Sequence, residues 1–299
     1  MIRVGIVDFD TSHVIQFTKR MNHIEIEEDQ WVDGAQVVAG CPMQSKHSPD
    51  RVPEYTEQMK ALGIEIVEDP ADLIKMIDAV CIEANDGTVH LERAKPFIEA
   101  GIPCYIDKPF ECSLENAKEI MRLAQANNVP TFSSSSLRFC PEVQDVLVDE
   151  EVGAIMGADA WSPASLHDLN PGLFNYGIHG VEILYTLMGG GCQKVSCAFT
   201  EGAEVTTGVW GDGRIGTMRG TRAGAHSYGY VAWGEKSVKQ SGISTQYIYR
   251  ELVKQIVKMF ETGQPPIDPN ITLEIVAFIV GAIESKEKGG AWVDLDLTL

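Results

Sequence analysis

The chain has 299 residues, of which 44% are apolar and 22% charged, so it can bury a large core and is too apolar to be disordered. Its 24 Lys and Arg against 43 Asp and Glu give a net charge of −19. That sign repels nucleic-acid phosphates and anionic lipid surfaces. We therefore expect neither nucleic acid nor a membrane as a partner.

The seven cysteines are scattered along the chain and never spaced as a CxxC pair, which indicates reduced thiols and no structural zinc site. The amino terminus enters an apolar strand at once, without the basic and long apolar segments of an export signal. No stretch approaches 18 uninterrupted apolar residues. These features predict a cytoplasmic protein, and we expect no bound metal.

Residues 1–135 alternate short β-branched runs with helical patterns, which is typical of βαβ units. We therefore expect a Rossmann-type, doubly wound parallel sheet in this first domain. The predicted strands cover residues 2–7, 36–40, 64–67, 78–83, 103–106 and 129–133.

Two of the connecting helices are well marked. Ser113 can cap a helix over residues 113–127, in which apolar residues recur at the 3.6-residue period. A helix over residues 88–100 has the same period, but Pro96 removes an amide donor and should kink or shorten it.

Residues 136–299 form a second, sheet-rich α/β domain in this prediction. Residues 204–221 have the pattern of a hairpin that turns at residues 211–213. The remaining predicted elements are helices over residues 176–188, 246–262 and 271–287 and a strand over residues 291–295.

The loop after the first predicted strand is polar where a dinucleotide fold places its G-x-G-x-x-G fingerprint, and all three glycines are missing. Two unit charges of one sign about 4 Å apart cost roughly 4 kcal/mol at an effective dielectric of 20. The two aspartates of the loop therefore weaken dinucleotide binding unless their side chains turn away. The loop residues are Asp8, Phe9, Asp10, Thr11, Ser12 and His13.

Asp10 has a second interpretation as the N-cap of the following helix. The second predicted strand ends in Cys41 and Pro42, where an NAD-binding fold places an acidic residue for the ribose hydroxyls. Lys46 and Arg51 follow, either to meet a 2′-phosphate or as solvated surface charge. The choice between NAD and NADP stays open.

Lys108 stands at the end of the fifth predicted strand, between Asp107 and Pro109, and therefore at the ligand-binding edge of a parallel sheet. An ammonium group there could stabilise a developing alkoxide or lower the pKa of a substrate hydroxyl. Taken alone, a Lys-Pro pair at a strand exit is also an ordinary surface feature.

A second polar cluster leads into the predicted helix over residues 176–188. Asn175 and His179 are four residues apart and His179 and Glu182 three apart, so they share one side of the helix or its first turn. A neutral imidazole held by a carboxylate is a good general base near neutral pH. The alternative is a core histidine beside a solvated glutamate. The cluster comprises His167, Asp168, Asn175, Tyr176, His179 and Glu182.

Several motifs in one order resemble the Gfo/Idh/MocA oxidoreductases, which have an E-K-P lysine motif, an R-F-x-P segment and a D-x-G-x-H-x-x-D helix. The resemblance covers essentially the whole chain, and the joint order is what makes it specific. After an initial Rossmann half, the matching segments are Asp107-Lys108-Pro109, Arg138-Phe139-Cys140-Pro141 and Gly177-x-His179-x-x-Glu182 before Leu187-x-Gly189.

The resemblance implies a second domain with a large open, mainly antiparallel sheet, which often forms the interface of a homodimer or homotetramer. It also implies hydride transfer between NAD or NADP and a carbohydrate-like substrate, a sugar or polyol. The resemblance further implies that Lys108 polarises the reacting hydroxyl and that His179 takes its proton, so we expect the two side chains to meet across a shared crevice. The implied cofactor contacts are Asp8, Asp10, Thr11, Ser12, His13, Asn85, Lys108 and Pro109; the implied substrate contacts are Arg138, His167, Tyr176 and Glu182.

The chain departs from the family pattern at several places. Asp107 replaces the Glu of E-K-P and Glu182 replaces the second Asp of the helix motif, and two further departures have larger chemical consequences. Asn175, the third catalytic candidate, stands where the family has an Asp that partners the histidine, and an amide cannot compensate an imidazolium as a carboxylate does. The Asp8 to His13 loop resembles a divergent branch of the family that carries Asp-Thr-Ser-His there. Dinucleotide binding that is weakened or lost is therefore one expectation.

Two further groups of residues have open roles. Asn85 follows the fourth strand as a cofactor or substrate contact, whereas His90 more simply caps or packs. The predicted hairpin is polar and aromatic, which indicates cross-strand ion pairs or a subunit contact. The alternative is an anionic substrate held by Arg219 or Arg222. The hairpin residues concerned are Trp210, Asp212, Arg214, Arg219 and Arg222.

Three functions are compatible with these residues. The first is a nicotinamide-dependent dehydrogenase acting on CH–OH groups of a carbohydrate-like substrate. The second is a lyase or glycosidase-like enzyme that uses the cofactor transiently, which the lost glycines and Asn175 favour. The third is a non-catalytic ligand sensor on the same fold.

Overall fold

The computed structural model of the chain describes residues 1–296. The chain forms two compact units. The first contains Met1–Glu111, Glu115–Ser134 and Tyr249–Pro269, and the second contains Cys112–Leu114, Ser135–Ile248 and the described residues from Asn270 onward. No helix in the described part of the chain is long and apolar enough to cross a membrane.

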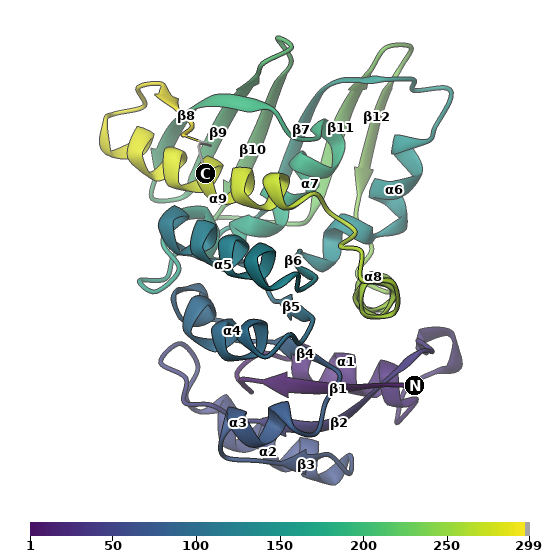
Figure 1. Cartoon of the computed structure of the whole chain (residues 1–299). Coiled ribbons are helices and arrows are strands. Elements are labelled where there is room, and N and C mark those ends of the chain that lie inside the picture. The colour runs from purple at the N-terminus through teal and green to yellow at the C-terminus, as the bar shows by residue number, and fades with distance from the viewer. Residues whose placement is uncertain (297–299) are drawn as a thin grey trace. The chain divides into compact units, whose positions relative to one another are not determined.

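The first unit is built on a six-stranded sheet in the order β3-β2-β1-β4-β5-β6, with every neighbouring pair parallel (Figure 1). In this order the direction in which successive strands are added to the sheet reverses between β1 and β4, and an open α/β sheet binds its ligand at that point. The predicted Rossmann-type sheet is confirmed. Its strands are β1 (Ile2–Val7), β2 (Ala35–Cys41), β3 (Glu65–Ile66), β4 (Ala79–Ile82), β5 (Cys104–Ile106) and β6 (Thr131–Ser133).

Helices pack against this sheet through apolar side chains that lie on one side of the helix. In the first helix, Val14, Phe17 and Met21 recur at helical spacing and are all buried. A short helix begins where Asp69 accepts a hydrogen bond from the amide of Ala71, with Pro70 in its first turn. The helices are α1 (His13–Asn22), α2 (Arg51–Ala61), α3 (Pro70–Ile74), α4 (His90–Glu99), α5 (Leu114–Asn127) and α8 (Ile248–Thr262).

Two local predictions for this unit need correction or addition. The helix α4 continues past Pro96 to Glu99, so the proline does not end it, and a turn of 3-10 helix, Gly87–Val89, precedes it. Helix α8 comes late in the sequence, yet it packs in the first unit, where a Cβ on Gly34 would meet Val257 and Glu261. The sequence alone assigned this segment to the second domain.

The second unit contains a seven-stranded sheet in the order β12-β11-β7-β10-β9-β8-β13. All its pairs are antiparallel except β7 with β10, so the predicted large, mainly antiparallel sheet is confirmed. The strands are β7 (Ile155–Pro163), β8 (Cys192–Thr200), β9 (Ala203–Trp210), β10 (Ile215–Thr221), β11 (Gly229–Gly234), β12 (Val238–Gly242) and β13 (Val293–Asp294).

Helices cover one face of this sheet (Figure 1). Met218 on β10 and Ser162 on β7 touch Gly180 of α7 (Gly177–Met188), and Phe278 of α9 (Pro269–Glu287) lies against Gly208 on β9. Side chains along β9 alternate between buried and half-buried, as a sheet with one covered face requires. The other helix of this unit is α6 (Pro141–Leu147).

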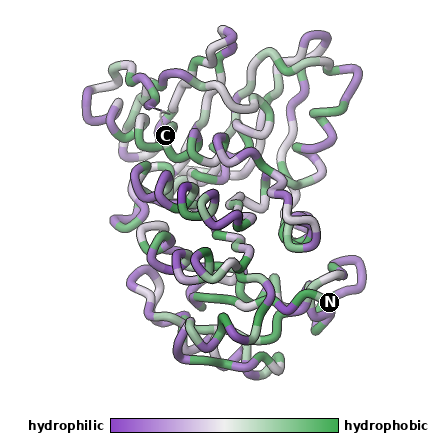
Figure 2. The backbone as a smooth tube through the Cα atoms, viewed as in Figure 1, coloured by the Kyte–Doolittle hydropathy of each residue, from purple (hydrophilic) through white to green (hydrophobic). Residues whose placement is uncertain are grey.

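The apolar residues of each unit lie on its strands and on the inner sides of its helices. Figure 2 shows the first sheet mostly in the hydrophobic colour, and Val4, Ile6 and Val7 on β1 are fully buried. A strand with helices on both faces needs such a continuous apolar run. The polar residues that end these strands therefore mark the ligand-binding edge.

Candidate active site

The loop between β1 and α1 is held in an unusual backbone conformation by its first aspartate. Asp8 has a φ of 65°, the left-handed region that glycine adopts more easily. Its carboxylate is buried and lies 3.3 Å from the Nε atom of Arg93. Burial raises the pKa of Asp8 to about 7, against the opposing attraction of Arg93.

Asp10 ties three loops together at the ligand-binding edge. Its carboxylate accepts hydrogen bonds from the hydroxyl of Ser45 at 2.5 Å and from the amide of Asn85 at 2.9 Å. Its carbonyl accepts one from the side-chain amide of Asn85 at 2.7 Å. The hypothesis that Asp10 caps α1 is therefore wrong, because Ser12 occupies the N-cap position and Asp10 bonds elsewhere. Asn85 braces this loop.

The loop offers a dinucleotide phosphate two features that fit. Asp8 and Asp10 are only 2% and 1% exposed, so both carboxylates are turned into the protein and not toward a ligand. Ser12 is exposed at the N-cap of α1 and makes no side-chain capping bond, which leaves its hydroxyl available beside a helix amino terminus. The residues therefore fit a dinucleotide, although without the close backbone approach that glycines give.

Lys108 is anchored through Asp107 to a buried charged cluster. Its Nζ atom lies 3.4 Å from Oδ2 of Asp107, and the same oxygen lies 3.0 Å from Nδ1 of His13. Oε2 of Glu83, one residue beyond β4, lies 3.6 Å from that imidazole nitrogen. His13 thus belongs to the surroundings of the lysine, which the motif alone did not indicate.

His90 supports the segment that carries Lys108. Its imidazole is fully buried, with Nδ1 2.9 Å from the carbonyl oxygen of Pro109 and Nε2 3.0 Å from that of Ala84. These contacts agree with the prediction that His90 packs. They also hold the β4 and β5 loops together, so the lysine stands on a rigid base.

In the second unit, His179 has a hydroxyl as a partner. Oγ of Ser135 lies 2.6 Å from Nδ1 of His179, and the same oxygen accepts a hydrogen bond from the amide of Leu137. Asn175 instead donates its side-chain amide to the carbonyl and hydroxyl of Ser165. Asn175, which stands where the family has an Asp, therefore holds the loop at Ser165, and neither of these hydrogen bonds involves His179.

Arg138 and Glu182 form a buried ion pair. Nε and Nη2 of Arg138 both lie 2.6 Å from Oε2 of Glu182, and each side chain is at most 7% exposed. Burial raises the pKa of Glu182, against the attraction of Arg138. The alternative of Glu182 as a solvated helix charge is wrong, because α7 is buried at this position. The pair joins α7 to the segment at residues 135–139.

A pocket of about 700 Å³ opens in the second unit beside His179. Tyr176 and Tyr228 line it, and their rings lie 5.9 Å and 5.6 Å from the imidazole of His179. Tyr176 is 52% exposed and has a φ of 56°, a strained conformation of the kind that concentrates at functional sites. The other lining residues are Pro163, Ser165, Leu166, Thr221, Arg222, His226 and Ser227.

The arginines of the β9–β10 hairpin mostly make ion pairs. Arg214 pairs with Asp212, and Arg222 pairs with Glu204 at 2.7 Å while it also lines the pocket. The prediction of cross-strand ion pairs is confirmed for Arg222 with Glu204, whereas Arg214 and Asp212 lie together in the turn between β9 and β10. His167 accepts a hydrogen bond from the amide of Leu169 and so shapes its own loop.

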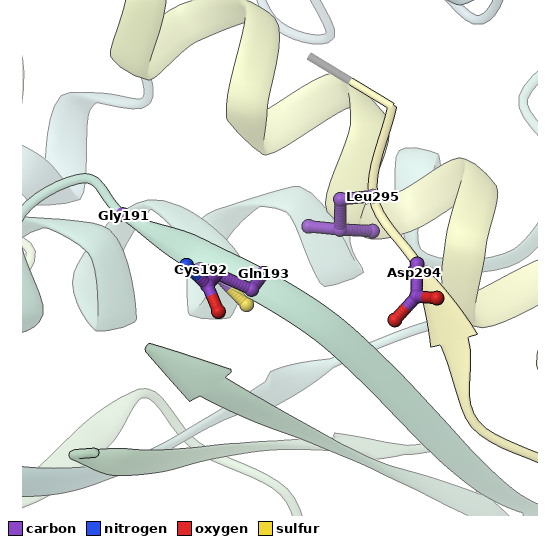
Figure 3. Close-up of a pocket in the computed structure, with 5 residues that line it drawn as sticks. All are labelled: Gly191, Cys192, Gln193, Asp294 and Leu295. Carbon is purple, nitrogen blue, oxygen red and sulfur yellow. The ribbon is translucent and has the colours of Figure 1, made fainter. Parts of the chain in front are cut away.

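A second hollow, of about 450 Å³, carries little chemistry. Figure 3 shows Cys192 and Gln193 at the start of β8 opposite Asp294 and Leu295. Among the described residues Asp294 is the carboxylate that lines it, and Gly191 also contributes to the lining. The pocket beside His179 is therefore the better candidate for a substrate.

Sequence reasoning missed three residues of these two clusters. Glu83 follows β4, and an acidic residue at the carboxyl end of a buried strand was a usable signal. Ser135 stands in a run of four serines, residues 133–136, that carries no recognisable motif. Tyr228 lies in a loop without any pattern, so its position beside His179 could be found only from the structure.

The chain has the same fold as several solved structures. A probable dehydrogenase from Thermotoga maritima superposes with a TM-score of 0.80 at 17% identity, covering 98% of each chain. Myo-inositol 2-dehydrogenase from Lactobacillus plantarum gives 0.80 at 15% identity and 99% of each chain. Scyllo-inositol dehydrogenase from Lactobacillus casei, solved with NAD(H) and scyllo-inositol, gives 0.78 at 18%, covering 98% of this chain and 99% of that one.

Residues 16–135 match the Gfo/Idh/MocA family, described as an oxidoreductase family with an NAD-binding Rossmann fold. This match lies largely in the first unit and confirms the resemblance seen in the motifs. The match begins after the Asp8 to His13 loop. A curated relative, "Putative oxidoreductase YceM" from Salmonella typhimurium, is 24% identical over 173 residues, which is 57% of this chain and 56% of the relative. This chain therefore matches only about half the length of that relative.

Proposed function

We propose that the protein is an NAD- or NADP-dependent dehydrogenase that acts on a CH–OH group of a sugar or polyol. The observation that carries this proposal is Lys108, held by Asp107 at the ligand-binding edge of an NAD-binding Rossmann sheet. When bound, the nicotinamide exchanges a hydride with the substrate carbon.

Two side chains act on the reacting hydroxyl in this proposal. The ammonium of Lys108 donates a hydrogen bond to the oxygen and stabilises the alkoxide that develops there. The imidazole of His179 takes the hydroxyl proton. Its partner, the Ser135 hydroxyl, carries no charge and so stabilises an imidazolium less than the family's Asp does.

The pocket beside His179 supports a carbohydrate-like substrate. A volume of about 700 Å³ suits a single sugar or polyol ring. Tyr176 and Tyr228 supply aromatic faces for its C–H groups, and the hydroxyls of Ser165 and Ser227 supply hydrogen-bonding groups. In this proposal Tyr176 contacts the substrate, whereas Arg138 and Glu182 act by holding α7.

Dinucleotide titration tests the proposal directly. We expect NADH or NADPH to bind saturably at micromolar levels, measured by calorimetry on the purified protein. A panel of inositols and aldoses would then be assayed for reduction of the oxidised cofactor. Absence of binding of either dinucleotide at millimolar levels would remove the dehydrogenase proposal.

Asp8 makes this binding depend on pH. Because its raised pKa is about 7, the carboxyl is mostly neutral at pH 6 and mostly ionised at pH 8. A pyrophosphate over this loop is then repelled only at the higher pH, and we expect wild-type affinity to fall about five- to tenfold between pH 6 and pH 8. Asp8→Asn, which tolerates the left-handed backbone, should bind equally well at both.

The same shift predicts a stability effect with a defined sign. The folded protein holds the Asp8 proton up to about pH 7, whereas the unfolded chain loses it near its ordinary value of 3.8. Stability is therefore lost as the pH rises from about 4 to 7, and Asp8→Asn should regain roughly 4 kcal/mol at pH 8 and nothing at pH 4. Urea unfolding at both values checks this, and an equal gain at both would contradict the assignment.

The uncovered face of the second sheet is the proposed interface of a homodimer or homotetramer. Val205 and Val209 on β9, Val231 on β11 and Trp233 at its end are half-buried or exposed in the single chain. We expect light scattering to give a mass of two or four chains. Val209→Glu together with Val231→Glu should lower that mass, whereas Lys95→Glu on α4 should not; a monomeric wild type would contradict the proposal.

A further inference from the structure

The buried cluster below Lys108 contains more charge than the proposed chemistry uses. His13, Glu83 and Asp107 come from three separate elements, and their side chains are 6% exposed for His13 and fully buried for both acids. Neither oxygen of Glu83 has a hydrogen-bond partner among the described residues. A buried carboxylate of this kind requires a nearby positive charge or a proton.

Two arrangements could neutralise the cluster, and charge balance separates them. If His13 and Lys108 are both cationic, they balance Glu83 and Asp107 and the four groups sum to zero. A divalent cation bound by both carboxylates and a neutral imidazole leaves an excess of one positive charge beside Lys108. Since excess charge is costly in a buried site, the imidazolium is favoured over the metal.

The surroundings of His13 are those of a fixed cation. Its ring stacks on Phe17 at 5.0 Å and meets the edge of Tyr249 at 5.1 Å, while Tyr105 donates to the other oxygen of Asp107. Burial alone lowers the pKa of His13, but Asp107 and Glu83 outweigh it and raise the pKa to about 10. Burial also raises the pKa of Glu83, and the imidazolium of His13 opposes that rise.

We propose that His13 is a positioning residue whose imidazolium shares Oδ2 of Asp107 with Lys108 and thereby lowers the proton affinity of the lysine amine. The two cations lie 3.0 Å and 3.4 Å from that one oxygen, so each weakens the hold of Asp107 on the other. Glu83 opposes this effect, because its negative charge partly compensates His13. In this way His13, which follows the loop after β1, changes the proton affinity of Lys108 through the carboxylate of Asp107.

The inference rests on the proposed role of Lys108, but its test needs neither substrate nor dinucleotide. Lysines of the full chain are dimethylated with ¹³C, and the Lys108 methyl signal is assigned by its loss in Lys108→Met. Titration of that signal gives the amine pKa. A failure of dinucleotide binding would therefore leave this result unaffected, and the reverse also holds.

Two variants isolate the charge of His13. Glu83→Gln should lower the amine pKa of Lys108 below the wild-type value, since His13 then loses its compensating charge. His13→Asn in the same Glu83→Gln background keeps a donor near the position of Nδ1 but removes the cation, and should raise that pKa by about one to two units relative to Glu83→Gln. A general loss of packing in the cluster would not lower the amine pKa of Lys108 in Glu83→Gln and then raise it in the double variant.

Equal amine pKa values in Glu83→Gln and in the double variant would overturn the proposal. One equivalent of zinc or manganese in the purified protein would also overturn it, because a metal would then occupy the place of the proton. If the double variant fails to fold, ¹⁵N shifts of the wild-type imidazole decide. Two protonated ring nitrogens in His13 at pH 8 support the proposal, and a neutral ring overturns it.

Discussion

Lys108→Met should lower kcat at least about 10³-fold on any sugar or polyol that the enzyme oxidises. Methionine fills a similar volume but carries no charge and no donor, so the developing alkoxide loses its stabilising partner. The rest of the segment should persist, because His90 holds the carbonyl of Pro109 independently of the lysine side chain. The assay follows formation of the reduced dinucleotide under saturating cofactor.

A matched control separates this effect from a general loss of positive charge. Lys95 lies on α4 in the same unit, is about half exposed and pairs only weakly with Glu99 at 3.8 Å. Lys95→Met should leave kcat within about twofold of wild type. Equal activity of Lys108→Met and Lys95→Met would show that the lysine has no role in the reaction.

Glu182→Gln should be the most destabilising change in the second unit. It leaves the guanidinium of Arg138 buried without a compensating charge, and breaking such a pair costs about 3–5 kcal/mol. Since α7 also carries His179, activity should fall in proportion to the unfolded fraction. Urea unfolding monitored by circular dichroism measures the loss.

The double variant Arg138→Met, Glu182→Leu provides the control for this pair. Replacing both charges with apolar groups of similar size removes the unpaired cation, so much of the stability should return. Its unfolding midpoint should lie closer to wild type than that of Glu182→Gln. A double variant as unstable as the single one would mean that packing at residue 182, and not its charge, is what matters.

The first sheet could be predicted from the sequence because its strands are buried on both faces. Such strands are short continuous apolar runs, and each of β1 to β6 falls within or next to a predicted range. Helix α8 was also predicted as a helix, but its place was not. Its apolar stripe, in which Leu252, Val253 and Ile256 are fully buried, shows that one side of the helix is packed. The stripe does not show which unit the helix packs in.

Site residues could be predicted from the sequence where a charged residue closely follows a predicted strand. Lys108 after β5 is the clearest case, and Asp8 and Asp10 after β1 were found in the same way. Contacts between distant loops were not predictable: nothing in the sequence joins Asp10 to Ser45, or Ser135 to His179. His13 was expected to touch a cofactor, yet its imidazole points to Asp107 and Glu83.

The late return of α8 has a practical consequence for dissecting this protein. Its Tyr249 closes over His13, and its Val257 lies beside Gly34. A recombinant fragment that ends at residue 135 would lack α8, which covers part of the core of the first unit. The apolar surface exposed in this way would promote aggregation. Anyone expressing the nucleotide-type half separately should graft residues 248–269 back onto it through a linker.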